Sequence, residues 1–271
     1  MITDEQVRTF QKDGFLLYGR VLEKEQLNEL REALARTMEN RSANKADAQR
    51  NLTGDDKNVV IQIVNIWLAE PAFRRHLYHP ELVTAVAKLM NTDTVRVWHD
   101  QIQVKPPKVG GPTIWHQDHP YWPIIQPADL VSAWVALEDA VIENGCMRMV
   151  RGSYHWGPYP GGTIGNDPVT HSPTPKPGFV PEGEQVEEVV CEVPAGSVVF
   201  HHCLTWHGAP PNHSDRNRPA IAVHYMPGHT RYVPTSGHLV EEHVRVAPGE
   251  ILTGDFFPTV YENGKLQEIS W

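Results

Sequence analysis

The sequence predicts a mostly β protein with flanking helices, on three observations. Short β-rich segments separated by Gly and Pro turns fill the region from about residue 94 to residue 235, which is typical of a sandwich or barrel. The preceding part, about residues 1–90, has mainly helical patterns. The length of 271 residues and a hydrophobic content of 40% suit one globular domain. We therefore expect a single domain over residues 1–271.

The first helix is expected to begin after Thr3, because Thr3 and Gln6 have the spacing of a capping box. The pair Asp13-Gly14 should end this helix. Residues 15–18, with the sequence Phe-Leu-Leu-Tyr, are then typical of a short strand.

Further helices follow in the N-terminal part. A helix from about Glu23 is predicted by apolar residues at a spacing near 3.6, namely Leu22, Leu27, Leu30, Leu34 and Met38. Residues 41–57 are polar and contain turn formers, so we expect a loop there. Pro71 and Pro80 each stand where a helix would have its first residue.

The strands of the predicted β core alternate in polarity or are rich in β-branched residues. They are expected at residues 94–98, 101–105, 130–137, 147–150, 186–190, 197–201 and 220–226. Between two of them lies a stretch, Gly152 to Gly183, that is dense in Gly, Pro, Ser and Thr. This stretch is too long for an ordinary connection, and it predicts a functional lid or a disordered insert.

Composition excludes several classes of function. The net charge of −9 argues against a nucleic-acid binder. We expect no secretory signal, because the start is polar and acidic, and the longest apolar stretch, residues 59–69, is too short to span a bilayer. Three scattered cysteines suit a reducing compartment. We expect a cytoplasmic protein, a monomer or weak homo-oligomer that acts on a small molecule and contacts neither nucleic acid nor membrane.

The chain has 15 histidines, and histidine is the side chain most often used to bind a metal. Three His-x-Asp/Glu pairs occur, at His79, His116 and His213, although about two are expected by chance. The pair at His79 coincides with a helix start, and the pair at His213 lies in a polar turn. The pair His116 and Asp118 stands among aromatic and imidazole groups, which suits a pocket.

A third ligand is expected from a distant strand, and His207 follows the segment Gly196–Phe200. Two histidines and one carboxylate that leave three positions open form the non-haem iron(II) arrangement. Arg218 lies eleven residues after His207, where its guanidinium suits the distal carboxylate of a 2-oxo diacid.

Together these motifs resemble the phytanoyl-CoA dioxygenase family of iron(II)/2-oxoglutarate oxygenases, over roughly residues 5 to 230. The matching segments are residues 13–15, 105–107, 115–123, 133–137, 143–147, 151–155 and 207–208, with Arg218. The resemblance implies a double-stranded β-helix core (a jelly roll, as in cupins). It also implies Fe(II) as cofactor, with 2-oxoglutarate and dioxygen as co-substrates. Succinate and CO2 would be released as an unactivated C–H of the substrate is hydroxylated.

The resemblance also assigns roles to residues. His116, Asp118 and His207 would be the iron ligands and catalytic residues, and Arg218 would bind 2-oxoglutarate. The other implied co-substrate contacts are Trp134, Gln62 and Gln101. One departure is Ala209, where family members often have Ser; the missing hydroxyl removes one potential hydrogen bond to 2-oxoglutarate, a modest change because Arg218 remains. Related halogenases replace the carboxylate ligand with a small residue, and the presence of Asp118 therefore favours hydroxylation.

The substrate is less well indicated by the sequence. Candidates for lining its pocket are His119, Tyr121, Trp122, Arg148 and Trp156, although aromatic residues more often pack in a core. Phosphates of an acyl-CoA substrate would need a basic entrance, which could come from Arg74-Arg75, Lys105 to Lys108 or Arg148 to Arg151. A small metabolite is an equal alternative. Two other functions stay open: a cupin-like metal-binding protein without oxygenase activity, and a related enzyme with a different oxidative outcome.

Overall fold

The computed structural model describes residues 1–39, 46, 48–159, 180–235 and 238–269. Its α-helices are α1 (Asp4–Asp13), α2 (Lys24–Glu39), α3 (Pro71–Leu77) and α4 (Pro80–Leu89). The predicted capping box is confirmed, because the Thr3 side chain accepts from Gln6 N–H and Gln6 Oε1 accepts from Thr3 N–H. Pro71 and Pro80 begin α3 and α4 as expected. None of the helices in these ranges is both long and apolar enough to cross a lipid bilayer.

The strands form two main antiparallel sheets. Their bounds are β1 (Phe15–Arg20), β2 (Ala48–Asn51), β3 (Ile61–Val64), β4 (Thr94–Lys105), β5 (Thr113–His116), β6 (Ile125–Gln126), β7 (Val131–Ala136), β8 (Met147–Val150), β9 (Glu188–Cys191), β10 (Ser197–His202), β11 (His207–Ala209), β12 (Arg218–Pro227), β13 (Arg231–Tyr232), β14 (Thr259–Glu262) and β15 (Lys265–Leu266). The mostly β prediction is confirmed.

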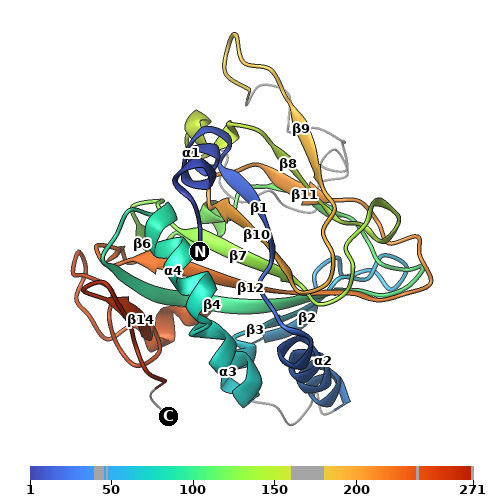
Figure 1. Cartoon of the computed structure of the whole chain (residues 1–271), viewed down its shortest axis with the longest axis horizontal. Coiled ribbons are helices and arrows are strands. Elements are labelled where there is room, and N and C mark those ends of the chain that lie inside the picture. Colours follow the sequence, from blue (N-terminus) through green and yellow to red (C-terminus); the bar gives the residue numbers. More distant parts are fainter. Residues whose placement is uncertain (40–45, 47, 160–179, 236–237, 270–271) are drawn as a thin grey trace.

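The larger sheet has the order β1-β10-β7-β12-β4-β14-β15, and β3 also pairs with β4 and carries β2 (Figure 1). The smaller sheet has the order β5-β11-β8-β9, and β6 pairs with β13. Side chains of β7, β10 and β12 share a hydrophobic cluster with side chains of β8 and β9. The two sheets therefore face each other across a common core, as the two layers of a jelly roll do.

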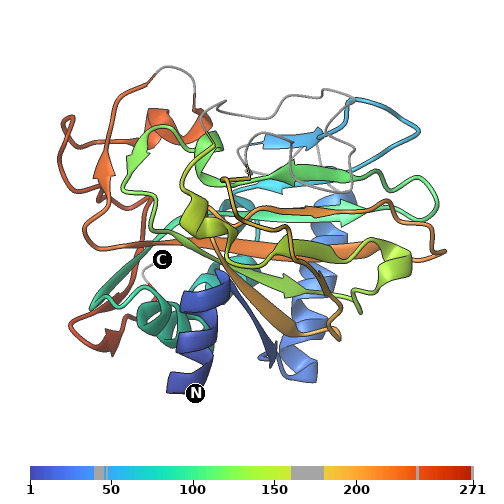
Figure 2. The ribbon, with the colours of Figure 1, turned by 90° about the horizontal axis from the view of Figure 1, so that it is seen from above.

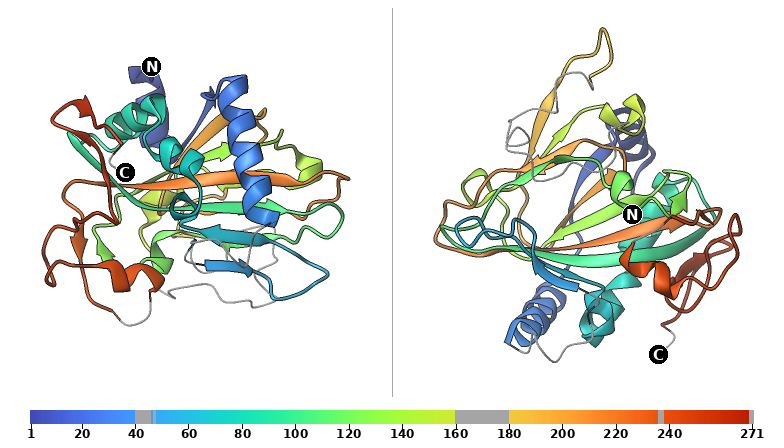
Figure 3. Two further views of the ribbon diagram at one scale, coloured as in Figure 1. Left: turned by 90° about the horizontal axis from the view of Figure 1, so that it is seen from below. Right: turned by 180° about the vertical axis from the view of Figure 1, so that it is seen from behind.

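Successive side chains of the central strands alternate between two environments: one beneath the helices and one between the two sheets. Val131, Ala133 and Val135 of β7 pack in the cluster that contains the helix residues, whereas Trp134 and Ala136 belong to the cluster between the sheets. The same period of two holds along β10 and β12, because successive strand residues point to opposite faces. Helices α2, α3 and α4 cover one face of the large sheet (Figure 3), and α2 lies on its far side when seen from above (Figure 2). The other face is left for the site.

The structure differs from the sequence predictions in several strands. Residues 48–51 of the expected loop form β2, because they pair with β3 in an antiparallel ladder. The predicted strands 94–98 and 101–105 are one continuous strand, β4. The sheet also continues past residue 235, where β14 pairs with β4. Most of the suggested lid, residues 160–179, lies outside the described residues; residues 153–156 form a 3-10 turn.

Candidate metal centre and active site

Three potential ligands converge between the two sheets. His116 ends β5, Asp118 follows two residues later, and His207 begins β11; the two histidines are direct partners in the β5–β11 ladder. Asp118 Oδ1 lies 3.6 Å from His116 Nε2 and 3.6 Å from His207 Nε2. One ligand atom from each residue lies within 4.8 Å of the other two. The structure thus brings together the three residues that the sequence separates by up to 91 positions.

Both histidines are held in the orientation that a metal ligand needs. His116 Nδ1 lies 2.7 Å from the carbonyl oxygen of Ile114, and His207 Nδ1 lies 2.9 Å from that of Thr205. A carbonyl only accepts, so each Nδ1 carries the proton and each Nε2 presents a lone pair toward Asp118. Burial lowers the pKa of His207 well below its usual range, which keeps this ring neutral.

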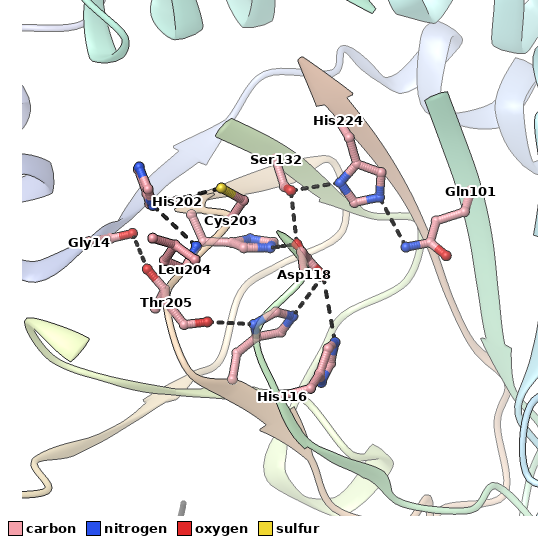
Figure 4. Close-up of polar contacts among 12 residues, drawn as sticks. Gly14, Gln101, His116, Asp118, Ser132, His202, Cys203, Leu204, Thr205 and His224 are labelled. Atoms are coloured by element: carbon pink, nitrogen blue, oxygen red, sulfur yellow. Dashed lines mark hydrogen bonds and ion pairs between the residues drawn. The ribbon is translucent and has the colours of Figure 1, made fainter. Parts of the chain in front are cut away.

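The second oxygen of Asp118 is bound by two residues that the sequence argument did not assign to the site (Figure 4). Ser132 Oγ donates to Asp118 Oδ2 at 3.2 Å, and His201 Nε2 lies 3.0 Å from the same oxygen. Burial by itself would raise the pKa of Asp118, but the imidazoles around it, among them the hydrogen-bond partner His201, hold it well below its usual range. Asp118 is therefore a carboxylate. Ser132 and His201 are neighbours across β7 and β10, a pairing that only a known register could have revealed.

These residues fit a divalent metal. Two neutral imidazole nitrogens and one ionised carboxylate are the ligand set of non-haem iron(II) sites, and they leave further coordination positions open. Asp118 Oδ1 faces both Nε2 atoms while Oδ2 is bound elsewhere. The donors and their hydrogen bonds are thus arranged before a metal arrives.

A small cavity of about 30 Å³ is lined by the three ligands and by Arg218. Arg218 is 1% exposed, and its Nε and Nη1 have no hydrogen-bond partner among the described residues. Its guanidinium carbon lies 5.4 Å from the centre of the Trp134 ring. Burial lowers the pKa of Arg218 to about 10, so it stays cationic at neutral pH. Ala209 lines the same cavity. A buried cation with unpaired donors is suited to an anionic ligand.

The neighbouring cation Lys105 is engaged elsewhere. Its ammonium donates to the carbonyl oxygens of Gly111 (2.8 Å), Ala209 (3.2 Å) and Pro210 (2.7 Å). All three donors of the ammonium are used, so Lys105 has none left for a ligand. Arg216 is exposed to solvent. Among these three cations, Arg218 is the one suited to an anion in the cavity.

A larger cavity of about 730 Å³ adjoins the small one, and His116 and Asp118 line both. Gln62 of β3 lines the larger cavity, and Gln101 of β4 lines both. Its other polar side chains include Arg50, Thr53, Asp55, Asn58, His99, Gln103 and His238. Its apolar side chains include Leu52, Val60, Val64, Ile114, Trp122 and Leu239.

Residues 10–220 match the family model of phytanoyl-CoA dioxygenase. The chain belongs to this family. A Caenorhabditis elegans protein named as a probable phytanoyl-CoA dioxygenase is 27% identical over 270 residues, which cover 91% of this chain and 84% of that one.

Two solved structures extend the comparison. The non-heme alpha ketoglutarate dependent carbocyclase SnoK from nogalamycin biosynthesis is 29% identical, with a TM-score of 0.79 over 95% of this chain and 96% of that one. The epimerase SnoN, in complex with Fe3+, alpha ketoglutarate and nogalamycin RO, is 25% identical, with a TM-score of 0.76 over 94% and 97%. This phytanoyl-CoA dioxygenase family member is thus an Fe(II)/2-oxoglutarate-dependent oxygenase with a jelly-roll core, and dioxygen is its second co-substrate.

Of the five residues suggested for substrate contact, two line a cavity in this family member and three do not. Tyr121 and Trp122 line the larger cavity. His119, Arg148 and Trp156 line neither cavity. His119 Nε2 is bound to the Ile125 carbonyl at 3.0 Å.

The other two are held by local partners. Arg148 forms an ion pair with Glu188 at 2.9 Å across β8 and β9. Trp156 packs on the cluster of Trp115, Val150 and Trp206.

Proposed function

We propose that His116, Asp118 and His207 bind Fe(II), and that Arg218 and Trp134 bind the distal carboxylate of 2-oxoglutarate. The enzyme would hydroxylate an unactivated C–H of a small organic molecule and release succinate and CO2. The observation that carries this proposal is the placement of an unpaired, buried Arg218 in the small cavity that the three ligands also line. A purely structural metal site would need no such anion-binding group.

The residues of this chain have three tasks in that reaction. Arg218 neutralises and orients the dicarboxylate, and the Trp134 face keeps the guanidinium in place. Ser132 and His201 occupy Asp118 Oδ2, which directs Oδ1 toward the histidines. Most side chains that line the small cavity are buried, which would limit the access of bulk water. Iron, when bound, supplies the activation of dioxygen that the protein's own side chains lack.

The substrate would occupy the larger cavity, with Tyr121 and Trp122 in its wall. Gln101, which lines both cavities, would contact 2-oxoglutarate, and Gln62 would hold Gln101 by donating to its Oε1. The mixed polar and apolar wall suits a molecule with several oxygen-bearing groups.

The basic groups considered for acyl-CoA phosphates are engaged elsewhere. Arg75 is paired with Glu29, and Arg74 lies 5.3 Å from the Trp67 ring. Lys108 donates to the His213 carbonyl at 2.9 Å. Arg151 pairs with Asp13 and with Glu187, and Arg148 pairs with Glu188. We therefore propose a small metabolite rather than an acyl-CoA thioester.

A second candidate is a different oxidative outcome at the same site. It is favoured by the 29% identity with SnoK, whose name describes ring closure. In both cases the first half of the reaction is the same, and only the fate of the substrate carbon differs. Product mass separates them, because hydroxylation adds one oxygen atom to the substrate and ring closure adds none.

Turnover of 2-oxoglutarate by ligand variants tests the proposal. His116→Ala, Asp118→Ala and His207→Ala should each abolish iron-dependent succinate release while the fold survives. His213→Ala and Asp215→Ala are matched controls, because they disrupt the same sequence motif at an exposed turn. Full turnover by Asp118→Ala would show that the ligand assignment is wrong.

A further inference from the structure

A chain of five hydrogen bonds runs from the wall of the larger cavity to Asp118. It links six side chains in the order Arg50, Gln62, Gln101, His224, Ser132 and Asp118. Its inner half, from Gln101 to Asp118, is visible in Figure 4. The proposed reaction uses single contacts of this chain, but it does not account for the continuous connection through His224.

The outer bonds of the chain all point toward Asp118. Arg50 Nε donates to Gln62 Oε1 at 2.8 Å, since a guanidinium only donates. Gln62 Nε2 donates to Gln101 Oε1, which leaves the Gln101 amide nitrogen for the next residue. Gln101 Nε2 lies 3.0 Å from His224 Nε2, and an amide nitrogen is a donor. His224 Nε2 must therefore be the acceptor.

The inner bonds follow from that assignment. A neutral imidazole that accepts at Nε2 carries its proton at Nδ1, which lies 2.7 Å from Ser132 Oγ. Ser132 then accepts from His224 and gives its own hydrogen to Asp118 Oδ2 at 3.2 Å. Every link is thus donor to acceptor in one direction, from a cation to a carboxylate, and chains of this kind strengthen cooperatively.

The middle of the chain is rigidly held. His224 and Ser132 are direct partners in the β12–β7 ladder, and both are buried. The His224 ring has edge contacts with Trp122, at 4.7 Å between centres, and with His99, at 4.6 Å. Burial lowers the pKa of His224 to about 4, in agreement with a neutral ring. The ring therefore has little freedom to turn away from Ser132.

We infer that Ser132, His224 and Gln101 are positioning residues that fix which oxygen of Asp118 faces the metal. With Oδ2 held by Ser132 and by His201, the carboxylate offers Oδ1 to the metal and cannot rotate to bind through both oxygens. This inference rests on the proposed function, because it takes Asp118 as a metal ligand. It adds a directional hydrogen-bond chain that reaches across five strands of the large sheet, β7, β12, β4, β3 and β2.

Metal affinity gives the first test. Co(II) alone is titrated into the metal-free protein and its visible absorption is followed. Ser132→Ala should weaken Co(II) binding by about tenfold or more, the usual loss when a hydrogen-bond partner of a metal ligand is removed. Ser197→Ala is the matched control: Ser197 is buried in β10, and its hydroxyl has no partner among the described residues. Equal affinity of Ser132→Ala and the wild type would overturn the inference.

The tautomer of His224 gives a second test that needs neither metal nor a stable Ser132 variant. Nitrogen-15 NMR of the imidazoles in the metal-free protein, assigned with His224→Gln, should show His224 protonated at Nδ1. Gln101→Met removes the donor to Nε2 and should shift this signal. Gln103→Met, two residues along the same strand, should leave it in place. A proton at Nε2 in the wild type would reverse the chain and overturn the inference.

The two proposals fail in different ways. If His116→Ala binds Co(II) as tightly as the wild type, the metal site itself is wrong, and the positioning role falls with it. If His116→Ala loses Co(II) but Ser132→Ala keeps it, the metal site stands and the positioning role is wrong. Both the metal site and the positioning role are supported if Ser132→Ala binds Co(II) about tenfold more weakly with unchanged thermal stability, and if His224 carries its proton at Nδ1.

Discussion

The guanidinium carbon of Arg218 lies 5.4 Å from the centre of the Trp134 ring, and the two residues belong to adjacent strands of the large sheet. The aromatic face covers one side of the planar cation, which leaves its N–H edge for a ligand in the small cavity. Contacts of this kind explain why an arginine, rather than a lysine, suits this position: a planar fork both stacks on a ring and binds a carboxylate through two parallel hydrogen bonds.

Replacement of Arg218 should weaken the binding of 2-oxoglutarate far more than the binding of iron. Arg218→Ala removes a charge-assisted, two-pronged contact, which costs about 1.5–3 kcal/mol, or one to two decades in affinity. Arg218→Lys should give an intermediate loss, because it keeps the charge but not the fork. The rate of succinate release, measured as a function of 2-oxoglutarate concentration and of Fe(II) concentration, gives the requirement for each. An unchanged 2-oxoglutarate requirement in Arg218→Ala would exclude Arg218 as the anchor.

Lys105 should be a stabilising residue and not a binding one. Lys105→Met would leave three buried carbonyl oxygens without their donor, and we expect a loss of about 3 kcal/mol in the free energy of unfolding. Lys108→Met is the control; this lysine makes one exposed bond, and its loss should cost no more than about 0.5 kcal/mol. Urea unfolding measures the difference. Comparable midpoints for the two variants would argue against a structural role of the buried ammonium.

Stability should fall as the pH falls below about 6.5. Burial lowers the pKa of His76 to about 3 and that of His202 to about 4, so these rings stay neutral in the folded state. The unfolded chain takes up protons near pH 6.5 while the folded chain does not, which favours unfolding as acid is added. Each such histidine contributes at most about 1.4 kcal/mol per pH unit between about pH 6.5 and its folded pKa.

His76 isolates one part of that pH dependence. It is buried in α3, and its Nε2 has no hydrogen-bond partner within the described ranges. His76→Leu should flatten the slope of unfolding free energy against pH between about pH 6.5 and pH 5. Urea unfolding of the metal-free wild type and variant at several pH values gives both slopes, and identical slopes would show that His76 takes up a proton in the folded state.

Coenzyme A should bind poorly to this protein. The basic groups considered above for its phosphates are paired with carboxylates, carbonyls or an aromatic ring, and none of them lines either cavity. Arg50, which does line the larger cavity, donates to Gln62. Calorimetric titration of the iron- and 2-oxoglutarate-loaded enzyme under anaerobic conditions should therefore show no micromolar binding of coenzyme A. Tight binding of coenzyme A would contradict the proposal that the substrate is not an acyl-CoA thioester.

Much of the fold was accessible from the sequence because local rules dominate in its helices. The capping box at Thr3 and the first-position prolines at Pro71 and Pro80 depend only on neighbouring residues. By contrast, β2 is polar and short, and it exists only because β3 offers a partner edge. The polar residues His99 and Asp100 interrupt the apolar pattern of β4, so the sequence pattern predicted two strands instead of one.

In the site, too, some residues could be predicted from local sequence and others only from the pairing of strands. His116, Asp118, His207 and Arg218 stand in recognisable motifs, and the structure gathers them. Ser132, His201 and His224 carry no motif; their relation to Asp118 comes from the register of β7, β10 and β12. Proximity in sequence also misleads, because His119 lies next to Asp118 but binds the Ile125 carbonyl and lines neither cavity.

Anaerobic absorption spectroscopy tests the central claim, that the two histidines and Asp118 bind iron(II) beside an anion site at Arg218. Fe(II) and 2-oxoglutarate added together to the wild type should produce the weak visible charge-transfer band of the chelate, and neither alone should do so. His207→Ala should show no band, and Arg218→Ala should need one to two decades more 2-oxoglutarate to reach half its intensity. Absence of the band in the wild type, or an undiminished band in His207→Ala, would contradict the account.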